Sequence, residues 1–308
     1  MPERRPRTNP EPEAPGTPVR LVEGDNLAWL AGVADRTYRL IYLDPPFNTG
    51  KRRRLRSLKT VRDEEGDRQG FGGVRYRSEV VGDLAYGDRF DDYLGFLAPR
   101  LEELVRVLAD DGSLFVHLDP RESHYVKVWL DGLLGRESFQ NEIVWAYDYG
   151  ARTRKRWPAK HDVILWYAKD PSRFVYDYEA INRIPYLAPG LVGPEKARRG
   201  KTPTDVWWQT IVPPAGKERT GYPTQKPLAI LRRIVAVHSE PGDEVLDPFA
   251  GSGTTGEAAW LLGRPVTLVD ENPEALEVMR RRLAAAEPTL ERVGARAAGR
   301  SPDRSSAR

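Results

Sequence analysis

Short apolar runs alternate with longer segments of helical periodicity over most of the chain. Apolar runs bounded by Gly, Pro or Asp are typical of buried strands, and apolar residues at every third or fourth position are typical of helices packed on a sheet. The predicted strands are 19–22, 39–43, 113–118, 163–167, 244–246 and 266–269. The predicted helices are about 90–108, 123–134, 228–238, 254–262 and 273–285. Strand and helix alternate, which predicts an α/β fold with a mostly parallel twisted sheet and helices on both faces.

Four stretches depart from this alternation. Residues 1–18 and 287–308 are polar and rich in Pro, Arg or Ser, and we expect both tails to be disordered. Residues 51–87 are basic with scattered glycines, and residues 147–222 are rich in Trp, Tyr, Pro and Arg. Loops of such length inside a compact domain are usually functional or disordered. The sequence therefore predicts a tail at 1–18, a first folded part with the basic loop at 19–146 and an inserted region at 147–222. A second folded part at 223–286 and a tail at 287–308 follow.

Composition narrows the class of protein. The chain has 308 residues, with 48 Lys and Arg, a net charge of +3 and a pI near 9.0, which suits a polyanionic partner. It has no apolar run long enough to span a bilayer and no signal peptide, so we expect a soluble cytoplasmic protein. Cysteine is absent, which excludes disulfides, thiolate metal sites and cysteine nucleophiles. The four histidines are scattered, and no metal site is expected.

The stretch LIYLDPPFNTG, residues 40–50, places a carboxylate, two prolines and an aromatic ring directly after a buried strand. Pro45 and Pro46 cannot continue a strand ladder, and Pro45 keeps Asp44 out of the helical region. Asp44 and Phe47 are therefore expected on a stiff corner at the carboxyl end of a strand, where open α/β sheets bind ligands. A strand-ending turn without a function is the alternative that this motif alone leaves open.

A second motif, DEVLDPFAGSGTTGEAAWLLG at 243–263, predicts a strand, a glycine-rich turn and a helix. Gly251 and Gly253 allow positive φ and a close approach of the backbone to a ligand, and the first amides of the helix face the turn. Asp270 ends the next predicted strand and is placed to hydrogen-bond a ribose hydroxyl. Together with this carboxylate after the next strand, the turn favours a nucleoside ligand. A tight turn with packing glycines is the alternative.

Together the motifs resemble those of the S-adenosylmethionine-dependent DNA methyltransferases that methylate amino groups. DPPF at 44–47 and DPFAGSGTT at 247–255 are similar to the catalytic and cofactor motifs of that family. GYPTQKPLAILRRIV at 221–235 resembles the segment before the cofactor motif, and VEGDNLAWL at 22–30 resembles the usual opening. The catalytic motif comes first, as in the circularly permuted β group. The resemblance implies a permuted Rossmann-like methyltransferase fold with a target-recognition region at 147–222.

The residue types fit methylation of an exocyclic amine on a flipped base. Asp44 and the Pro45 carbonyl can each accept an amine hydrogen, and Asp44 favours the positive charge that develops on nitrogen. Pro45 and Pro46 hold these groups rigid, and Phe47 offers a flat surface on which the base can stack. Methylation at cytosine C5 requires a thiolate, which this chain lacks. Adenine N6 and cytosine N4 both remain open on geometry, and the resemblance favours adenine N6.

The resemblance also assigns contacts to the cofactor, S-adenosylmethionine. Asp270 would hold the ribose, although glutamate is commoner there, and Thr224 and Lys226 would hold the methionine carboxylate. Asp25 would either contact the cofactor adenine or only cap a helix. The full set of candidate cofactor residues is Asp25, Thr224, Lys226, Asp247, Phe249, Gly251, Gly253, Thr254 and Asp270.

Double-stranded DNA is the predicted partner. The basic run at 51–59 is interpreted as a phosphate-binding loop beside the catalytic corner, with a solvated surface loop as an almost equal alternative. Basic residues of 147–222 could read or position the DNA. We expect the tryptophans of that region (Trp157, Trp207 and Trp208) to be local core, and His161 to be structural. The candidate DNA-binding residues are Lys51, Arg52, Arg53, Arg54, Arg152, Arg154, Lys155, Arg156 and Lys160.

Several further expectations follow from the resemblance alone. They are a homodimer, a cognate restriction endonuclease, and association with the nucleoid when the protein is bound to DNA. The alternatives to a DNA methyltransferase are an RNA methyltransferase, a protein-glutamine methyltransferase and a non-catalytic DNA-binding module. Binding of radiolabelled cofactor, followed by transfer of the label to DNA, would separate them.

Overall fold

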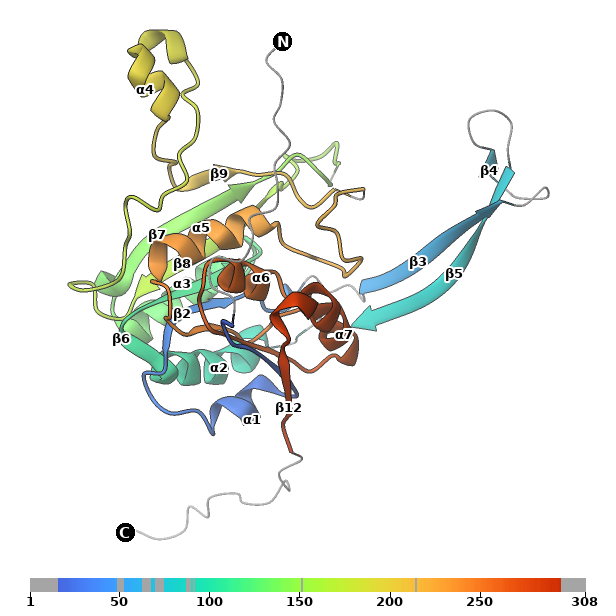
Figure 1. Ribbon diagram of the computed structural model, residues 1–308, viewed down its shortest axis with the longest axis horizontal. Coiled ribbons are helices and arrows are strands. Elements are labelled where there is room, and N and C mark those ends of the chain that lie inside the picture. The colour runs from blue at the N-terminus through green and yellow to red at the C-terminus, as the bar shows by residue number, and fades with distance from the viewer. Residues whose placement is uncertain are drawn as a thin grey trace.

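The computed structural model of the chain describes residues 16–48, 53–62, 68–69, 75–86, 90, 92–150, 152–213 and 215–294, and for 53–62, 68–69 and 75–86 it describes the backbone only. Within these residues, no helix is long and apolar enough to cross a membrane. Two regular layers of helices enclose a central sheet, and a separate ribbon that contains β3 (Arg53–Arg62), β4 (Arg68–Gln69) and β5 (Arg75–Tyr86) projects from this body (Figure 1).

In the described part of the chain, nine strands form one sheet in the order β12-β1-β11-β10-β2-β6-β8-β7-β9. Neighbours from β12 to β6 pair in parallel, β8 is antiparallel to both β6 and β7, and β9 is parallel to β7. Leu40, Ile41 and Leu43 of β2 are fully buried because helices cover both faces. The strands are β1 Val19–Glu23, β2 Tyr38–Leu43, β6 Leu108–Leu118, β7 Phe139–Ala146, β8 His161–Ala168, β9 Val206–Trp208, β10 Val245–Asp247, β11 Val266–Asp270 and β12 Thr289–Arg292.

The order of the sheet reverses between β10 and β2, because β11 and β1 continue on one side and β6 on the other. Open α/β sheets bind ligands at such a switch point, outside the carboxyl ends of the strands. Asp247 ends β10 and Asp44 follows β2, so both lie at this point. The strand order and the buried parallel strands make the fold a Rossmann-like, doubly wound α/β sheet.

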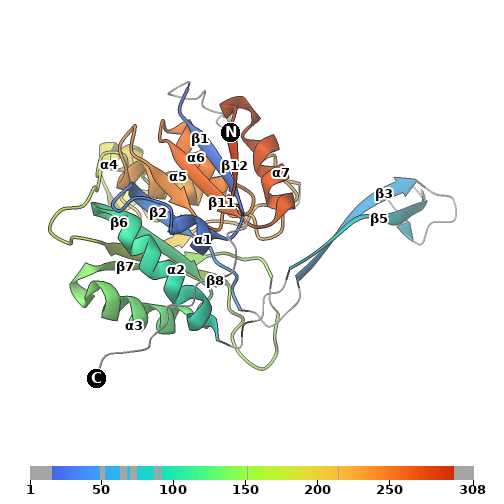
Figure 2. The same cartoon turned by 90° about the horizontal axis from the view of Figure 1, so that it is seen from below.

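Helices cover both faces of the sheet, as Figure 2 shows. One buried cluster joins α5, α6 and α7 to one face, and a second joins α1, α2 and α3 to the other. Successive residues of β2 divide between the two clusters, since Leu40 and Tyr42 belong to the first and Ile41 and Leu43 to the second. The α-helices are α1 Asn26–Leu30, α2 Tyr93–Val107, α3 Ser123–Leu134, α4 Pro194–Arg199, α5 Leu228–His238, α6 Thr254–Leu261 and α7 Pro273–Arg282. The 3₁₀ turns are η1 Arg136–Ser138, η2 Pro189–Leu191 and η3 Ala284–Ala286.

The basic stretch predicted as a loop at 51–87 contains regular structure. β3 (Arg53–Arg62) and β5 (Arg75–Tyr86) pair antiparallel along their length, and β4 (Arg68–Gln69) joins β5. In both views this ribbon extends away from the central sheet (Figures 1 and 2). The apolar residues of 53–62 (Leu55, Leu58 and Val61) are three positions apart and do not alternate, so the sequence lacks the period-two pattern that predicts a strand.

Two of the predicted segments contain a strand that was not predicted from the sequence. The region 147–222 contributes two strands to the nine-stranded sheet: β8, which overlaps the predicted strand 163–167, and β9, which was not predicted. The tail predicted from residue 287 begins too early, because β12 pairs in parallel with β1, with Arg20 opposite Thr289. Every residue of β12 is exposed, so this edge strand has no hydrophobic pattern by which it could be recognised.

Candidate active site

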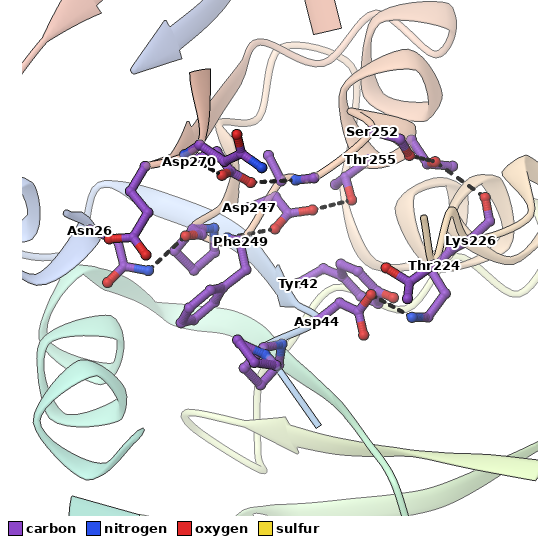
Figure 3. A pocket seen from close by; sticks show the side chains of 18 of the residues that line it. Asn26, Tyr42, Asp44, Thr224, Lys226, Asp247, Phe249, Ser252, Thr255 and Asp270 are labelled. Carbon is purple, nitrogen blue, oxygen red and sulfur yellow. Dashed lines mark hydrogen bonds and ion pairs between the residues drawn. The ribbon is translucent and has the colours of Figure 1, made fainter. Parts of the chain in front are cut away.

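A cavity of about 380 Å³ lies at the switch point of the sheet. Its walls come from the ends of β1, β2, β10 and β11, from the turn before α6 and from the segment before α5. Figure 3 shows that side chains from these distant segments point toward a common space. Every predicted catalytic residue lines it, and so do all the predicted cofactor residues except Gly253: Asp25, Asp44, Pro45, Pro46, Phe47, Thr224, Lys226, Asp247, Phe249, Gly251, Thr254 and Asp270.

Asp44 has two different oxygen environments. Lys226 Nζ donates a hydrogen bond to Asp44 Oδ2 at 2.5 Å, and the two side chains are 9% and 16% exposed. Asp44 Oδ1 is buried and has no hydrogen-bond partner among the described residues. A buried carboxylate oxygen without a donor is costly, which marks it as an acceptor for a ligand. The ammonium of Lys226 also lies over the ring of Phe47, 4.8 Å from its centroid.

Asp247 organises the glycine-rich turn. Its Oδ1 accepts a hydrogen bond from the amide of Phe249 at 3.0 Å, and its Oδ2 accepts one from Thr255 Oγ1 at 2.5 Å. Burial raises the pKa of Asp247 to about 7, although these hydrogen bonds act in the opposite direction. Asp247 is 2% exposed and both its oxygens accept hydrogen bonds from the turn, so its main role is to shape the turn.

Asp270 fixes the same turn from the neighbouring strand. Its Oδ2 accepts a hydrogen bond from the amide of Gly251 at 2.8 Å, and its Oδ1 accepts one from the amide of Asn272 at 2.9 Å. Burial raises its pKa to about 6 against the effect of these amides. Each oxygen has a second lone pair for a hydroxyl donor. Gly251 has a φ of +50°, and a Cβ there would approach the Tyr222 ring to 3.3 Å.

Gly253 and Thr254 contribute mainly to the packing of the turn against its neighbours, and less to the lining of the cavity. Gly253 has a φ of +73°, and a Cβ on it would lie 2.8 Å from Met279 Cγ of α7. Thr254 is 4% exposed and its hydroxyl donates to the carbonyl oxygen of Lys226 at 3.2 Å. Gly253 precedes the first residue of α6 without a side-chain cap. The turn therefore presents the amide end of a helix toward the cavity.

Asp25 caps α1, because its Oδ1 accepts a hydrogen bond from the amide of Ala28 at 2.8 Å. Its Oδ2 accepts one from Arg100 Nη2 at 2.7 Å. Arg100 also donates to the side chain of Asn26 and to the carbonyl oxygen of Phe96. Asp25 thus both lines the cavity and acts as a cap, and the two predicted roles are compatible.

Other residues of the cavity were not singled out from the sequence. One of them is Tyr42 of β2. It precedes Asp44, which directly follows the strand, by two residues, and both side chains line the cavity as strand alternation would place them. His117 of β6 is fully buried, with its ring centroid 5.9 Å from that of Phe47. The alternation of side chains along the strand could have identified Tyr42 as a residue of the site. No sequence pattern indicates that His117 lies beside Phe47. The remaining side chains and backbone that sequence reasoning missed include Asn26, Phe90, Phe96, Arg100, Tyr222 and Asn272.

The predicted DNA-binding residues are only partly described. Lys51 and Arg52 lie outside the described residues, and Arg53 and Arg54 begin β3 with undescribed side chains. Arg152, Arg154, Lys155 and Arg156 are exposed in the segment between β7 and β8, while Lys160 is half-buried and donates to the carbonyl oxygen of Asp148 at 2.7 Å. That segment starts and ends at the carboxyl edge of the sheet, because Ala146 pairs with His161 there.

The prediction that the tryptophans are core is right for one of them. Trp207 is 8% exposed, whereas Trp208 is 74% exposed and Trp157 is 93% exposed. Trp207 and Trp208 are adjacent in edge strand β9 and therefore point to opposite faces. Trp157 lies in the basic segment between β7 and β8. His161 is half-buried as the first residue of β8.

Comparison with known proteins adds four similarities. The DNA methylase family of N6/N4 methyltransferases matches residues 38–281 of the chain. The type II methyltransferase M.HpaI of Haemophilus parainfluenzae is 30% identical over 264 residues, covering 86% of this chain and 74% of that protein. The DNA adenine methyltransferase YhdJ of Escherichia coli K12 is 29% identical over 294 residues, covering 91% and 88%. The crystal structure of an M1.HpyAVI–SAM complex superposes with a TM-score of 0.55 at 19% identity, covering 86% of this chain and 98% of that one, a likeness in fold.

Proposed function

This chain belongs to the DNA methylase family of N6/N4 methyltransferases and is a DNA methyltransferase, and from that premise we propose that it methylates adenine N6 in double-stranded DNA with S-adenosylmethionine as the methyl donor. The DPPF corner and the similarity to a DNA adenine methyltransferase support adenine as the target. Cytosine N4 is the second candidate, because both amines sit on equivalent edges of a flipped base.

The cavity fits this cofactor by its size and its chemistry. Its volume of about 380 Å³ falls within the range of small-molecule sites. Gly251 leaves room for close backbone approach, and Asp270 presents carboxylate oxygens for ribose hydroxyls. We assign Phe249 to the cofactor adenine, with Asp25 at the rim, and Thr224 and Lys226 to the carboxylate of the amino-acid part. When bound, S-adenosylmethionine supplies a methyl group on a positively charged sulfur.

The observation that carries the proposal is the unpartnered Asp44 Oδ1 in the same cavity as the glycine-rich turn. Asp44 Oδ1 accepts one hydrogen of the target amine and the Pro45 carbonyl accepts the other, which localises the nitrogen lone pair for attack. Phe47 stacks on the base, and Pro46 keeps the ring and the acceptors in one rigid arrangement. As the nitrogen gains the methyl group it becomes positive, and Asp44 stabilises that charge before the extra proton leaves to water.

We propose that DNA lies along the carboxyl edge of the sheet. The exposed cations Arg152, Arg154, Lys155 and Arg156 would contact the duplex, and the basic stretch from Lys51 to Arg54 would add phosphate contacts. Lys160 would position the segment through its contact with Asp148. A homodimer and a cognate restriction endonuclease stay proposals that rest on resemblance, and light scattering in solution tests the dimer.

The direct test is to express the wild type and Asp44→Ala in a host that lacks its own DNA methyltransferases and to sequence the host DNA with kinetics that distinguish the modified bases. We expect N6-methyladenine at one sequence motif with the wild type and none with Asp44→Ala. N4-methylcytosine at a motif would move the target to the second candidate. Unmodified DNA from cells containing folded wild type, together with no transfer of radiolabel to DNA, would overturn the proposed function.

A further inference from the structure

The side chain of Lys226 bridges the two halves of the active site. Its backbone is held on the cofactor side, because its carbonyl oxygen accepts the hydroxyl of Thr254 at 3.2 Å. Its ammonium reaches the catalytic side, 2.5 Å from Asp44 Oδ2 and 4.8 Å from the centroid of Phe47. Lys226 is 8% exposed, so this ion pair is formed largely away from water.

These two contacts are the ones that the target base needs. The amine of the base must donate to Asp44, and the ring of the base must cover Phe47. A stacked ring lies at van der Waals distance from Phe47, in the space that the ammonium holds 4.8 Å from the ring centroid. In the ligand-free protein the ammonium of Lys226 therefore occupies the place of the base. The base can stack on this face of Phe47 only after the ammonium has moved away.

Lys226 is held by fewer contacts than the other cation of the cavity. Arg100 and Lys226 are the cationic side chains that line it within the described residues. Arg100 is held by Asp25, by Asn26 and by the carbonyl oxygen of Phe96. Lys226 has Asp44 as its partner, and it is the cation that an incoming carboxylate can recruit without dismantling the wall of the cavity.

We propose that Lys226 is a positioning residue that couples the two substrates: without cofactor it covers Asp44 and Phe47, and the carboxylate of the cofactor's amino-acid part draws it away and opens the base site. This inference rests on the proposed function. It predicts that the cofactor binds before the target base is captured. Because coupling between two binding sites is reciprocal, DNA with a captured base must tighten cofactor binding by the same factor.

If Lys226 responds to the carboxylate of the cofactor, a ligand without that carboxylate should not open the base site even when it fills the nucleoside part of the cavity. S-adenosylhomocysteine carries the carboxylate, whereas 5′-deoxy-5′-methylthioadenosine has the nucleoside half without it. Both are to be titrated calorimetrically into wild type with and without a duplex that contains the methylated motif. We expect the duplex to tighten binding of S-adenosylhomocysteine by roughly 5- to 150-fold, the usual range of such couplings. Binding of the methylthioadenosine should not change.

Variants of Lys226 provide the second arm. Lys226→Met keeps much of the length of the side chain and removes its charge, so the duplex should no longer tighten S-adenosylhomocysteine binding. With 2-aminopurine at the target position, unstacking should need S-adenosylhomocysteine in wild type and should occur without it in Lys226→Met. Lys226→Arg should restore part of the dependence. Lys169→Met is the matched control, because Lys169 is also partly buried but donates to Val105 and Leu108 carbonyls at the amino edge of the sheet.

The outcomes separate this inference from the proposed function. Equal affinity of wild type for S-adenosylhomocysteine with and without the duplex would overturn the coupling. Full coupling in Lys226→Met, or the same effect of the duplex on both nucleosides, would overturn the role of Lys226. Either result in a protein that methylates DNA leaves the proposed function intact, whereas a wild type that transfers no methyl group fails the proposed function itself.

Discussion

The imidazole of His117 lies 2.7 Å from the hydroxyl of Tyr42, two residues before Asp44. The other ring nitrogen of His117 lies 3.2 Å from Asp162 Oδ2, and Asp162 Oδ1 accepts a hydrogen bond from the hydroxyl of Tyr147 at 3.0 Å. Burial tends to raise the pKa of Asp162, but the hydrogen bonds and charge of its neighbours outweigh burial and lower it. A buried polar chain thus connects the strand that carries the catalytic corner to the first residue of the exposed basic segment.

Removing one end of this chain of hydrogen-bonded side chains should slow methylation by more than the loss of stability accounts for. Tyr147→Phe deletes a hydroxyl that bonds a buried carboxylate, at a cost of about 1–3 kcal/mol in the free energy of unfolding. Tyr167→Phe is the matched control, since that hydroxyl donates to Asp131 Oδ1 at 2.7 Å at the opposite end of β8. We expect similar losses of stability, but slower single-turnover methylation only in Tyr147→Phe. Equal rates in the two variants would make the polar chain purely structural.

Asp44→Ala should abolish methyl transfer without weakening cofactor binding. It removes the acceptor of the amine hydrogen, which should cost on the order of 3 kcal/mol or more in the transition state. Single-turnover assays and calorimetry with S-adenosylhomocysteine measure the two effects. Near-wild-type turnover of Asp44→Ala would show that the carboxylate is not the acceptor.

Gly251→Val should weaken cofactor binding roughly tenfold or more, equivalent to about 1.4 kcal/mol or more. Valine is strained at a φ of +50°, and its Cβ would approach the Tyr222 ring to 3.3 Å. Gly190→Val is the control, because Gly190 is exposed and a Cβ added there would have no heavy atom within 4 Å. Unchanged affinity in Gly251→Val would remove the turn from the binding site.

Cofactor affinity should fall as the pH drops through about 6. Burial raises the pKa of Asp270 to about 6, and ribose hydroxyls donate to the ionised form. Above that pH the carboxylate is already ionised; below it, binding must release a proton, so affinity decreases by up to about tenfold per pH unit. Asp270→Asn should bind more weakly at neutral pH and lose this dependence. Calorimetry in buffers of different ionisation enthalpy counts the proton released.

Changing Arg52, Arg53 and Arg54 together to Ala should weaken binding to cognate and random duplexes by similar factors. The log–log dependence of affinity on salt should become shallower by roughly two to three units, because fewer counterions are released. The charge-matched control is Arg36, Arg136 and Arg173 to Ala, exposed residues at the amino edge of the sheet. Loss on the cognate duplex alone would indicate base reading instead, and no change would leave the stretch as a solvated surface.

The parts of the fold with strong periodicity could be predicted from the sequence. α3 and α5 coincide with their predicted ranges, and β2 and β11 differ by one residue at an end. β7 could not be predicted, because Phe139 to Glu142 are only half-buried or exposed and the apolar signal is confined to its second half. β9 is three residues long and lies at an edge, where neighbouring tryptophans face opposite ways.

The site could be predicted where one motif carries it, and not where distant segments meet. The corner at Asp44 and the turn at Gly251 are each local, and their place at the carboxyl edge follows from parallel strands. The pair of Lys226 with Asp44 joins positions 182 residues apart, and Tyr42 with His117 joins positions 75 apart. These contacts depend on the order and register of the strands, and a local sequence pattern predicts neither.

Asn48 and Phe90 lie 42 residues apart in the chain, yet the amide of Phe90 donates to Asn48 Oδ1 at 2.9 Å. Asn48 Nδ2 also donates to Glu122 Oε1 at 2.9 Å, which anchors this closure to the start of α3. Asn48 and Phe90 therefore form a clasp, and the described strands β3, β4 and β5 belong to the stretch of chain between its two residues. Because this clasp joins the two flanks of the stretch directly, we expect a change in the length of the ribbon to leave the catalytic corner in place.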